Sequence, residues 1–304
     1  MNFKPELFNS KLLLFGEYGM IFDAMALSVP FPRFCGYLDW DTDHAHQGSS
    51  SEIRKYYQHL TTRQGQKLHF PFDLQGFKND LDKGLYFNSN IPQQYGIGSS
   101  GALVAALFSR YAARRSYEYK LSADLLKVDF AQLEVWFHGK SSGIDPLVSF
   151  LNRPLLIDSR KMIQPVQLDL AQTGLSFALI DTLITSPTSP LVQHFIDLFN
   201  LPEFKTAFES QFIPANNGCI ESLLKNDHST FFSFLKQLIS FQLQHFGRMI
   251  PPNFHILISE ALSQQVYIKL LGSGGGGFLM AISPSEIILN KWAEIKGVSL
   301  LKVV

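Results

Sequence analysis

A glycine- and serine-rich loop over residues 92–102 has the composition of a phosphate-binding loop. Its sequence is Pro-Gln-Gln-Tyr-Gly-Ile-Gly-Ser-Ser-Gly-Ala, and the two glycines at 96 and 98 allow the backbone to turn sharply and to approach a ligand closely. The loop leads into a predicted helix, whose first N–H groups and positive dipole end attract phosphate. Serine hydroxyls there can bond a phosphate oxygen or bind Mg²⁺, which prefers oxygen ligands. The alternative is a glycine turn with serine as an ordinary N-cap.

A second glycine-rich loop lies near the C-terminus. Five of the six residues 272–277 are glycine, and apolar runs predicted to be strands flank them at 266–271 and 278–282. Glycine loses more conformational entropy on folding than other residues do, so the run indicates close packing around a substrate or another loop. A flexible hairpin connection is the alternative.

Two carboxylates, Glu134 and Asp145, lie 11 residues apart around a third glycine-containing loop, residues 138–146. Asp145 follows a turn that can direct its carboxylate into a cleft. Glu134 has apolar neighbours near the end of a predicted helix, and a partly buried acid usually needs a lysine or a metal ion as its partner. Taken separately, a turn-capping aspartate and a solvated glutamate on the helix surface are the simpler interpretations.

The elements that must position these loops mix strands and helices in both halves of the chain. Strands are predicted over residues 11–15, 20–22, 26–29, 155–158, 177–183, 266–271 and 278–282. Helices are predicted over residues 98–115, 122–137 and, in several pieces, 190–246, with a short helical or turn segment after residue 146. Residues 39–52 are polar and are expected to form an exposed loop. This mixture is typical of an α/β or α+β protein.

Composition excludes several classes of function. The chain is 46% hydrophobic and 17% charged, and its 26 basic residues equal its 26 acidic ones, so it lacks the basic excess of nucleic-acid and anionic-membrane binders. Cys35 and Cys219 cannot form a disulfide framework or a zinc site. No apolar run approaches a membrane span, and Gly16 and Glu17 interrupt the apolar segment that would form a signal peptide. We expect about two domains and a cytoplasmic location.

The three loops, in this order and together with the run Lys-Leu-Leu-Leu-Phe-Gly-Glu at 11–17, resemble the galactokinase/homoserine/mevalonate/phosphomevalonate (GHMP) kinase superfamily. The resemblance extends from Lys11 to about Phe278. Each motif alone is weak, whereas their combination is highly specific. It implies a two-lobed α+β fold, with a ribosomal-protein-S5-like N-terminal lobe over 1–160 and a ferredoxin-like C-terminal lobe over 161–304.

The resemblance also implies a role for each group of residues. The ATP phosphates would bind at Gly96, Ile97, Gly98, Ser99, Ser100, Gly101 and Ala102. Mg²⁺ would be held by Ser100 and Glu134. Asp145 would face the acceptor hydroxyl, as a general base or as an orienting group, with Lys11 beside it to keep it ionised. The acceptor side or the glycine loop would comprise Glu17, Tyr18, His138, Gly274, Gly275 and Gly276.

Residues 142–145, Ser-Gly-Ile-Asp, are similar to the mevalonate kinase form of the catalytic loop. The expected reaction is therefore transfer of the γ-phosphate of ATP to the hydroxyl of mevalonate, in isoprenoid precursor synthesis. Gly101 replaces the usual alanine and Tyr18 the usual histidine, and both variants are similar to phosphomevalonate kinases, so phosphomevalonate is the alternative acceptor. A catalytically inactive regulator that binds ligand is the alternative from another class. The expected partners are ATP and a small molecule, with neither nucleic acid nor membrane; dimers are common among relatives, and a homodimer stays open.

Other groups of suggestive residues have simpler interpretations. Asp41, Asp43, His44 and His46 are metal-type side chains in a polar loop, where solvation is the usual state. The basic residues Arg110, Arg114 and Arg115 suit the C-terminal end of a helix dipole. His138 can be either an acceptor contact or a helix cap.

Overall fold

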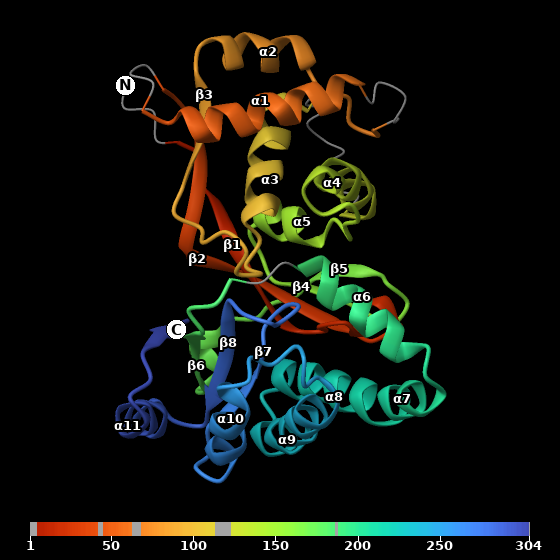
Figure 1. Cartoon of the computed structure of the whole chain (residues 1–304), viewed down its shortest axis with the longest axis vertical. Coiled ribbons are helices and arrows are strands. Elements are labelled where there is room, and N and C mark those ends of the chain that lie inside the picture. Colours follow the sequence, from red (N-terminus) through yellow and green to blue (C-terminus); the bar gives the residue numbers. More distant parts are fainter. Residues whose placement is uncertain (1–4, 42–44, 63–67, 113–122, 186–187, 304) are drawn as a thin grey trace. The chain divides into compact units, whose positions relative to one another are not determined.

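The computed structural model of the 304-residue chain describes residues 5–41, 45–62, 68–112, 123–185 and 188–303. The chain divides into two compact units (Figure 1). The first unit comprises residues 1–11, 30–92 and 98–153, and the second comprises residues 12–29, 93–97 and 154–304. Segments 12–29 and 93–97 thus group with C-terminal residues, and the division into lobes 1–160 and 161–304 stays a prediction.

Two long strands run through both units. β1 is Phe8–Phe15 and β2 is Ala26–Trp40. In the first unit the last residues of β2 pair antiparallel with β3 (Leu85–Ser89), with Trp40 opposite Leu85. In the second unit the first residues of β2 pair antiparallel with β4 (Leu155–Ile157), which pairs in turn with β5 (Ile163–Pro165). Because strands continue from one unit into the other, neither unit is a single stretch of sequence.

The described part of the first unit also contains five helices: α1 (Gln47–Thr62), α2 (Leu74–Asp82), α3 (Ser99–Tyr111), α4 (Ala123–His138) and α5 (Ile144–Leu151). α3, α4 and α5 contact one another (Figure 1). Helical spacing explains the core between α1, α2 and α3. Apolar residues three or four apart turn inward together and form a buried cluster: Ile53, Tyr56, Phe77, Leu81, Leu85, Leu103, Leu107 and Tyr111.

The rest of the second unit is a four-stranded antiparallel sheet with helices. Its strands are β6 (Ser176–Asp181), β7 (Tyr267–Leu270), β8 (Phe278–Ser283) and β9 (Leu300–Lys302), in the spatial order β7-β8-β6-β9. All three strand pairs are antiparallel, helices follow β6 and β8, and β7 leads directly to β8. This order is that of a ferredoxin-like lobe, so the predicted α+β class is confirmed.

Helices of the second unit carry most of its aromatic core. They are α6 (Thr188–Phe199), α7 (Pro202–Ala207), α8 (Ile213–Leu224), α9 (His228–His245), α10 (Phe254–Leu262) and α11 (Glu286–Lys296), and the π-helical turn η3 (Phe208–Phe212) joins α7 to α8. The buried phenylalanines include Phe195, Phe208, Phe212, Phe231 and Phe246. Most of the chain's 27 phenylalanines thus serve as core residues.

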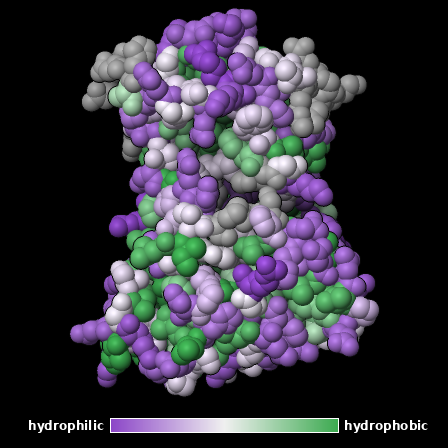
Figure 2. Space-filling model, in the orientation of Figure 1, coloured by the Kyte–Doolittle hydropathy of each residue, from purple (hydrophilic) through white to green (hydrophobic). Residues whose placement is uncertain are grey.

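The structure differs from the sequence-based prediction at two places near the N-terminus. Residues 20–22 were expected to be a strand, but η1 (Gly19–Ile21) is a turn of 3₁₀ helix that follows the left-handed Tyr18. Residues 39–52 were expected to be an exposed loop, yet Trp40 ends β2 and α1 begins at Gln47. The first residues of α1 are polar and give no apolar periodicity, because its buried residues, Ile53 and Tyr56, come later in the helix. The surface of the second unit mixes polar and apolar side chains (Figure 2).

The remaining candidates have ordinary structural partners or fall outside what is described. Asp41 accepts hydrogen bonds from the Ala45 and His46 N–H groups, and the His46 ring stacks on Tyr86. Arg110 binds the Asp80 carboxylate through Nε at 2.8 Å and through a terminal nitrogen at 2.6 Å. The other four residues of these groups lie outside the described residues: Asp43, His44, Arg114 and Arg115. None of the helices among the described residues is both long and apolar enough to span a membrane.

Candidate active site

The N-terminus of α3 is built by a glycine. Gly98 is its N-cap in the left-handed conformation, with φ of 83°, and its carbonyl accepts the Ala102 N–H at 2.9 Å. A glycine has no side chain to cap the first-turn N–H groups, so these groups can face an anion. An ordinary serine N-cap is therefore the wrong interpretation, and the Ser100 hydroxyl is used elsewhere.

Ser100 and Ser141 both donate to the Glu134 carboxylate. The Ser100 hydroxyl lies 2.9 Å from Glu134 Oε1, and the Ser141 hydroxyl lies 2.5 Å from Oε2. Glu134 extends from α4, while Ser141 belongs to the turn that follows that helix, and its hydroxyl also accepts the Gly143 N–H at 2.9 Å. The Glu134 side chain is buried, so it is not a solvated acid on the helix surface.

Burial makes the Glu134 carboxylate difficult to ionise. Burial, and then the nearby Asp145 charge, raise the pKa of Glu134 to about 7, against the smaller lowering effects of the two serine hydrogen bonds and of Lys11. A cation bound at this carboxylate would replace the proton. The Glu134 carboxylate therefore gains or loses its proton near neutral pH in the absence of a bound cation.

Lys11 and Asp145 form an ion pair in the first unit. Lys11 Nζ lies 3.0 Å from Asp145 Oδ1; the lysine side chain is 6% exposed and the aspartate side chain 34% exposed. Asp145 is the second residue of α5, whose N-cap is Gly143. The carboxylate is therefore held by a buried cation on one side and remains accessible on the other, which a simple turn cap would not require.

Two glycines at the start of α3, the N-cap Gly98 and Gly101, allow the backbone there to lie close to Lys11 and to α5. A Cβ at Gly98 would lie 2.9 Å from Lys11 Cγ, and a Cβ at Gly101 would lie 2.8 Å from both Asp145 C and Pro146 N. The N-terminal ends of α3 and α5 consequently meet at the Lys11–Asp145 pair. Both helix dipoles present their positive ends there, a setting that favours anions.

The donor set fits Mg²⁺ better than a closed metal centre. The described residues contain no group of three or more His, Cys, Asp or Glu side chains that could hold a metal. One carboxylate and one hydroxyl, 2.9 Å apart at Glu134 and Ser100, suit an ion that takes few protein oxygens and fills its remaining positions with phosphate and water. The raised pKa of Glu134 agrees with a site that accepts a cation.

Glu17 and Tyr18, which the resemblance places near the acceptor or the glycine loop, lie in the second unit. Glu17 is fully buried and pairs with the equally buried Lys269, whose ammonium also donates to the Leu270 carbonyl. The Tyr18 hydroxyl donates to the Ser273 carbonyl at 2.5 Å. None of the sequence motifs assigns a role to Lys269. Its position within the apolar run 266–271 nevertheless indicates a buried ion pair.

The glycine loop connects β7 to β8, and it is hydrogen-bonded at several points. The Gly275 N–H donates to the Met249 carbonyl at 2.5 Å, and the Gly277 N–H donates to the Ile184 carbonyl at 2.7 Å. Cβ atoms at Gly274 and Gly276 would each lie 2.4 Å from a carbonyl oxygen. The loop is a hairpin connection, as the simpler interpretation has it, but a tightly packed one.

The predicted phosphate-binding run is divided between the units. Gly96 and Ile97 belong to the second unit, where a Cβ at Gly96 would lie 3.8 Å from the Leu271 carbonyl oxygen, and Ile97 is buried. Residues 98–102 belong to the first unit. His138 is the last residue of α4, and its side chain is outside what the structure describes. Hydrogen bonds join Glu134 to Ser100 and Ser141. Of these three residues, Ser141 is the one to which the motifs assign no role.

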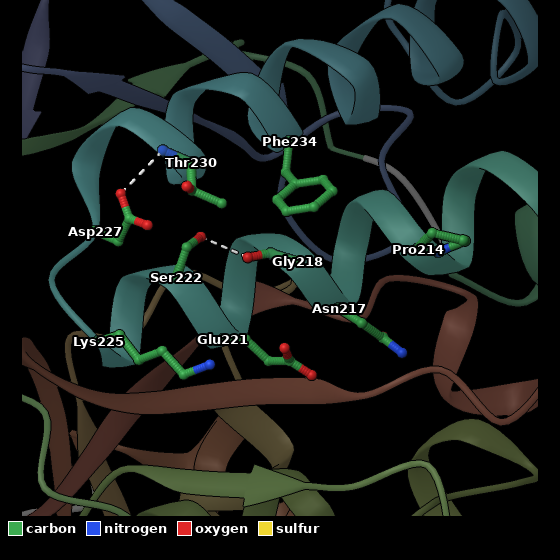
Figure 3. A pocket seen from close by; sticks show the side chains of 9 residues that line it. All are labelled: Pro214, Asn217, Gly218, Glu221, Ser222, Lys225, Asp227, Thr230 and Phe234. Carbon is green, nitrogen blue, oxygen red and sulfur yellow. Dashed lines mark hydrogen bonds between the residues drawn. The ribbon is translucent and has the colours of Figure 1, made fainter.

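A hollow of about 260 Å³ lies on the second unit between α8 and α9 (Figure 3). Its polar groups serve the helix pair: Asp227 accepts the Thr230 N–H at 3.1 Å, and the Ser222 hydroxyl donates to the Gly218 carbonyl at 2.5 Å. No predicted site residue lines it. The hollow therefore adds no residue to the candidate site at Lys11, Ser100, Glu134 and Asp145.

Comparison with known proteins identifies the type of domain. Residues 54–153 match the family model of the GHMP kinases N terminal domain. A comparison with curated proteins gives no match. Among solved structures, L. major mevalonate kinase in complex with R-mevalonate is 17% identical, covers 98% of this chain and 94% of its own, and has a TM-score of 0.67.

Two further solved structures have similar folds. Streptococcus pneumoniae phosphomevalonate kinase is 18% identical, with 98% of each chain covered and a TM-score of 0.64. Lactococcus lactis galactokinase, in complex with galactose, is 13% identical, with 97% of this chain and 92% of its own covered and a TM-score of 0.59. Residues 54–153 are therefore similar to the N-terminal domain of GHMP kinases, and the fold of the chain is similar to the folds of these three kinases.

Proposed function

We propose that this protein transfers the γ-phosphate of ATP to the hydroxyl of mevalonate. The observation that carries the proposal is the Lys11–Asp145 ion pair at 3.0 Å, at the point where the N-termini of α3 and α5 meet. Phosphoryl transfer needs mainly positioning and charge stabilisation. An accessible carboxylate beside a buried ammonium, next to two positive helix ends, supplies both.

Asp145 is the group that takes or orients the proton of the acceptor hydroxyl. Lys11 lies beside this carboxylate, with its Nζ 3.0 Å from Asp145 Oδ1, and its ammonium can steady the acceptor oxygen. N–H groups at the start of α3, in residues 98–102, bind phosphate oxygens. Glu134 and Ser100 would hold Mg²⁺, which supplies neutralising charge to the phosphate oxygens when it is bound.

The choice of mevalonate rests on the loop Ser-Gly-Ile-Asp at 142–145 and on the fold shared with a mevalonate kinase. Phosphomevalonate is the second candidate. Two observations favour it: Tyr18 and Gly101 stand where the mevalonate kinase pattern has histidine and alanine, and a phosphomevalonate kinase shares the fold. We expect the protein to act in the cytoplasm, in isoprenoid precursor synthesis.

The direct test is ADP release by the purified protein with Mg·ATP and mevalonate, run in parallel with phosphomevalonate. Release that depends on mevalonate supports the proposal, and release with phosphomevalonate alone replaces it by the second candidate. Silence with both acceptors, while ATP still binds, would favour the ligand-binding regulator.

Asp145→Asn isolates the catalytic assignment. Loss of a general base lowers turnover by roughly 10²–10⁴-fold, whereas binding of a non-hydrolysable ATP analogue, measured by calorimetry, should persist. Asp169→Asn is the matched control, because Asp169 is an exposed cap of a 3₁₀ turn (Leu170–Thr173) in the second unit and asparagine caps equally well. Turnover of Asp145→Asn within about tenfold of the unmodified protein, a difference of roughly 1.4 kcal/mol in barrier, would remove Asp145 from this role.

A further inference from the structure

Tyr18 has a backbone conformation that its residue type disfavours. Its φ is 60°, in the left-handed region that bulky side chains rarely adopt. Such a residue persists only where its surroundings determine its position more strongly than its own preference does. The contacts of the Tyr18 side chain are therefore the place to look for the cause.

Both parts of the Tyr18 side chain are engaged within the second unit. The ring stacks on Phe195 at 4.5 Å between centroids and meets Phe246 edge-on at 5.5 Å. The hydroxyl donates to the Ser273 carbonyl at 2.5 Å, and the residue is only 7% exposed. Burial, and then the adjacent Glu17 charge, raise the pKa of the hydroxyl, so it stays a protonated donor at physiological pH.

The acceptor of this hydrogen bond belongs to the glycine loop, residues 272–277. Apart from Ser273 these residues have no side chains with which to fix the loop. Gly272, Gly274, Gly275 and Gly277 all have positive φ, a conformation that is freely available to glycine and therefore weakly held in the absence of external contacts. The Tyr18 hydroxyl supplies such a contact from a position 255 residues earlier in the sequence than Ser273.

The loop in turn packs against the start of the phosphate-binding run. A Cβ at Gly277 would lie 2.8 Å from the Tyr95 carbonyl oxygen, and one at Gly272 would lie 3.6 Å from the Gly96 carbonyl oxygen. The Tyr95 ring also contacts the Phe278 ring, at 4.9 Å between centroids. A shift of the glycine loop would consequently displace residues 95 and 96.

We infer that Tyr18 is a positioning residue, which fixes the glycine loop through its hydrogen bond to the Ser273 carbonyl and thereby fixes residues 95–96 for nucleotide binding. Because both its ring and its hydroxyl are occupied, Tyr18 is not a contact for the acceptor. The nucleotide part of this inference rests on the proposed function. The effect on the loop does not.

The test is Tyr18→Phe, which removes the hydroxyl and keeps the stacked ring. Amide hydrogen exchange, followed by mass spectrometry on nucleotide-free protein, should show the Gly275 and Gly277 N–H groups exchanging roughly 3- to 10-fold faster, the effect expected for loss of one hydrogen bond. Tyr56→Phe is the matched control. The buried Tyr56 hydroxyl donates to the Leu133 carbonyl at 2.9 Å in the first unit, so its loss should leave exchange in residues 272–277 unchanged.

A kinetic measurement separates positioning from acceptor contact. With the acceptor that the protein turns over, Tyr18→Phe should raise KM for ATP by roughly 3- to 10-fold and leave KM for the acceptor within twofold. Unchanged exchange in residues 272–277 would overturn the inference, as would a rise in acceptor KM without a rise in ATP KM. If Tyr18→Phe does not fold, Phe195→Leu loosens the ring from its other side and should produce the same faster exchange. Absence of kinase activity would count against the proposed function and leave the exchange result valid.

Discussion

Replacing Glu134 by glutamine should make the metal-free protein more stable at alkaline pH. Burial raises the pKa of this carboxylate from 4.5 to about 7, while the unfolded chain keeps an ordinary value near 4.5. Below about pH 4.5 both states are protonated. Between about pH 4.5 and 7 the folded state retains a proton that the unfolded state has lost, so the free energy of unfolding falls as the pH rises. Above about pH 7 the penalty is complete.

The magnitude follows from the size of the shift. A shift from 4.5 to about 7, at about 1.4 kcal/mol per unit, corresponds to roughly 3 kcal/mol, of which about 2.5 kcal/mol develops between pH 5 and pH 8. Glutamine at 134 has the same size and no charge. The unfolding free energy of Glu134→Gln minus that of the unmodified protein should therefore rise by about 2.5 kcal/mol from pH 5 to pH 8. Titrating groups that do not interact with residue 134 cancel in this difference.

Tryptophan fluorescence can follow the first unit alone. The chain has three tryptophans, and in a Trp292→Phe background the remaining Trp40 and Trp136 both belong to the first unit. Urea unfolding would be measured in this background with EDTA at pH 5 and pH 8, for protein with glutamate and with glutamine at 134. A difference that changes by less than about 0.5 kcal/mol would refute the reasoning from burial and charge. Added Mg²⁺ should stabilise only the protein that retains Glu134, and equal stabilisation of both would refute the metal assignment.

Two further predictions concern close packing and the buried ion pair. Gly101→Ala should destabilise the protein by roughly 1–3 kcal/mol in urea unfolding, because its Cβ would lie 2.8 Å from the backbone of α5. Gly48→Ala is the control: Gly48 lies on the exposed side of α1 with open space around it, and this substitution should stabilise the protein by about 0.5–1 kcal/mol. Equal effects of the two substitutions would contradict the close approach of α3 to α5. Glu17→Gln should cost about 3–5 kcal/mol because it leaves Lys269 buried without its counter-charge, and adding Lys269→Met should recover most of that loss. A double-mutant cycle measures this coupling, and strictly additive effects would contradict it.

The sequence predicts the local features of this site better than its long-range contacts. Helix α3 after the glycine loop, the α4–turn–α5 segment and the β7–β8 hairpin follow from glycine positions and apolar periodicity, and the burial of Glu134 follows from its apolar neighbours. The hydrogen bond from the Ser141 hydroxyl to Glu134 could not be predicted, because it depends on how the turn after α4 folds back. Lys269 reaches Glu17 across 252 residues, a distance over which no local pattern carries information.

Two errors in secondary structure have the same origin. Residues 20–22 are apolar enough for a strand, but the left-handed Tyr18 before them begins a 3₁₀ turn. The polar start of α1 looks like a loop because its buried residues come later in the helix. In both places a contact with distant residues overrides the local preference: Tyr18 through the glycine loop, and Ile53 and Tyr56 through the core shared with α2 and α3.

The division of the chain into interleaved segments has a consequence for biosynthesis. The chain passes from one unit to the other five times, between residues 11 and 12, 29 and 30, 92 and 93, 97 and 98, and 153 and 154. On the ribosome, residues 12–29 emerge among the first, but the pairing of Ala26 with β4 must wait for Ile157, and the ion pair of Glu17 must wait for Lys269. Contacts between such distant residues slow folding, so the second unit cannot be completed before nearly the whole chain has been translated. The nascent chain thus carries the first residues of β2 without β4, and Glu17 without Lys269, for a large part of its synthesis, the stage at which we expect this protein to depend most on chaperones.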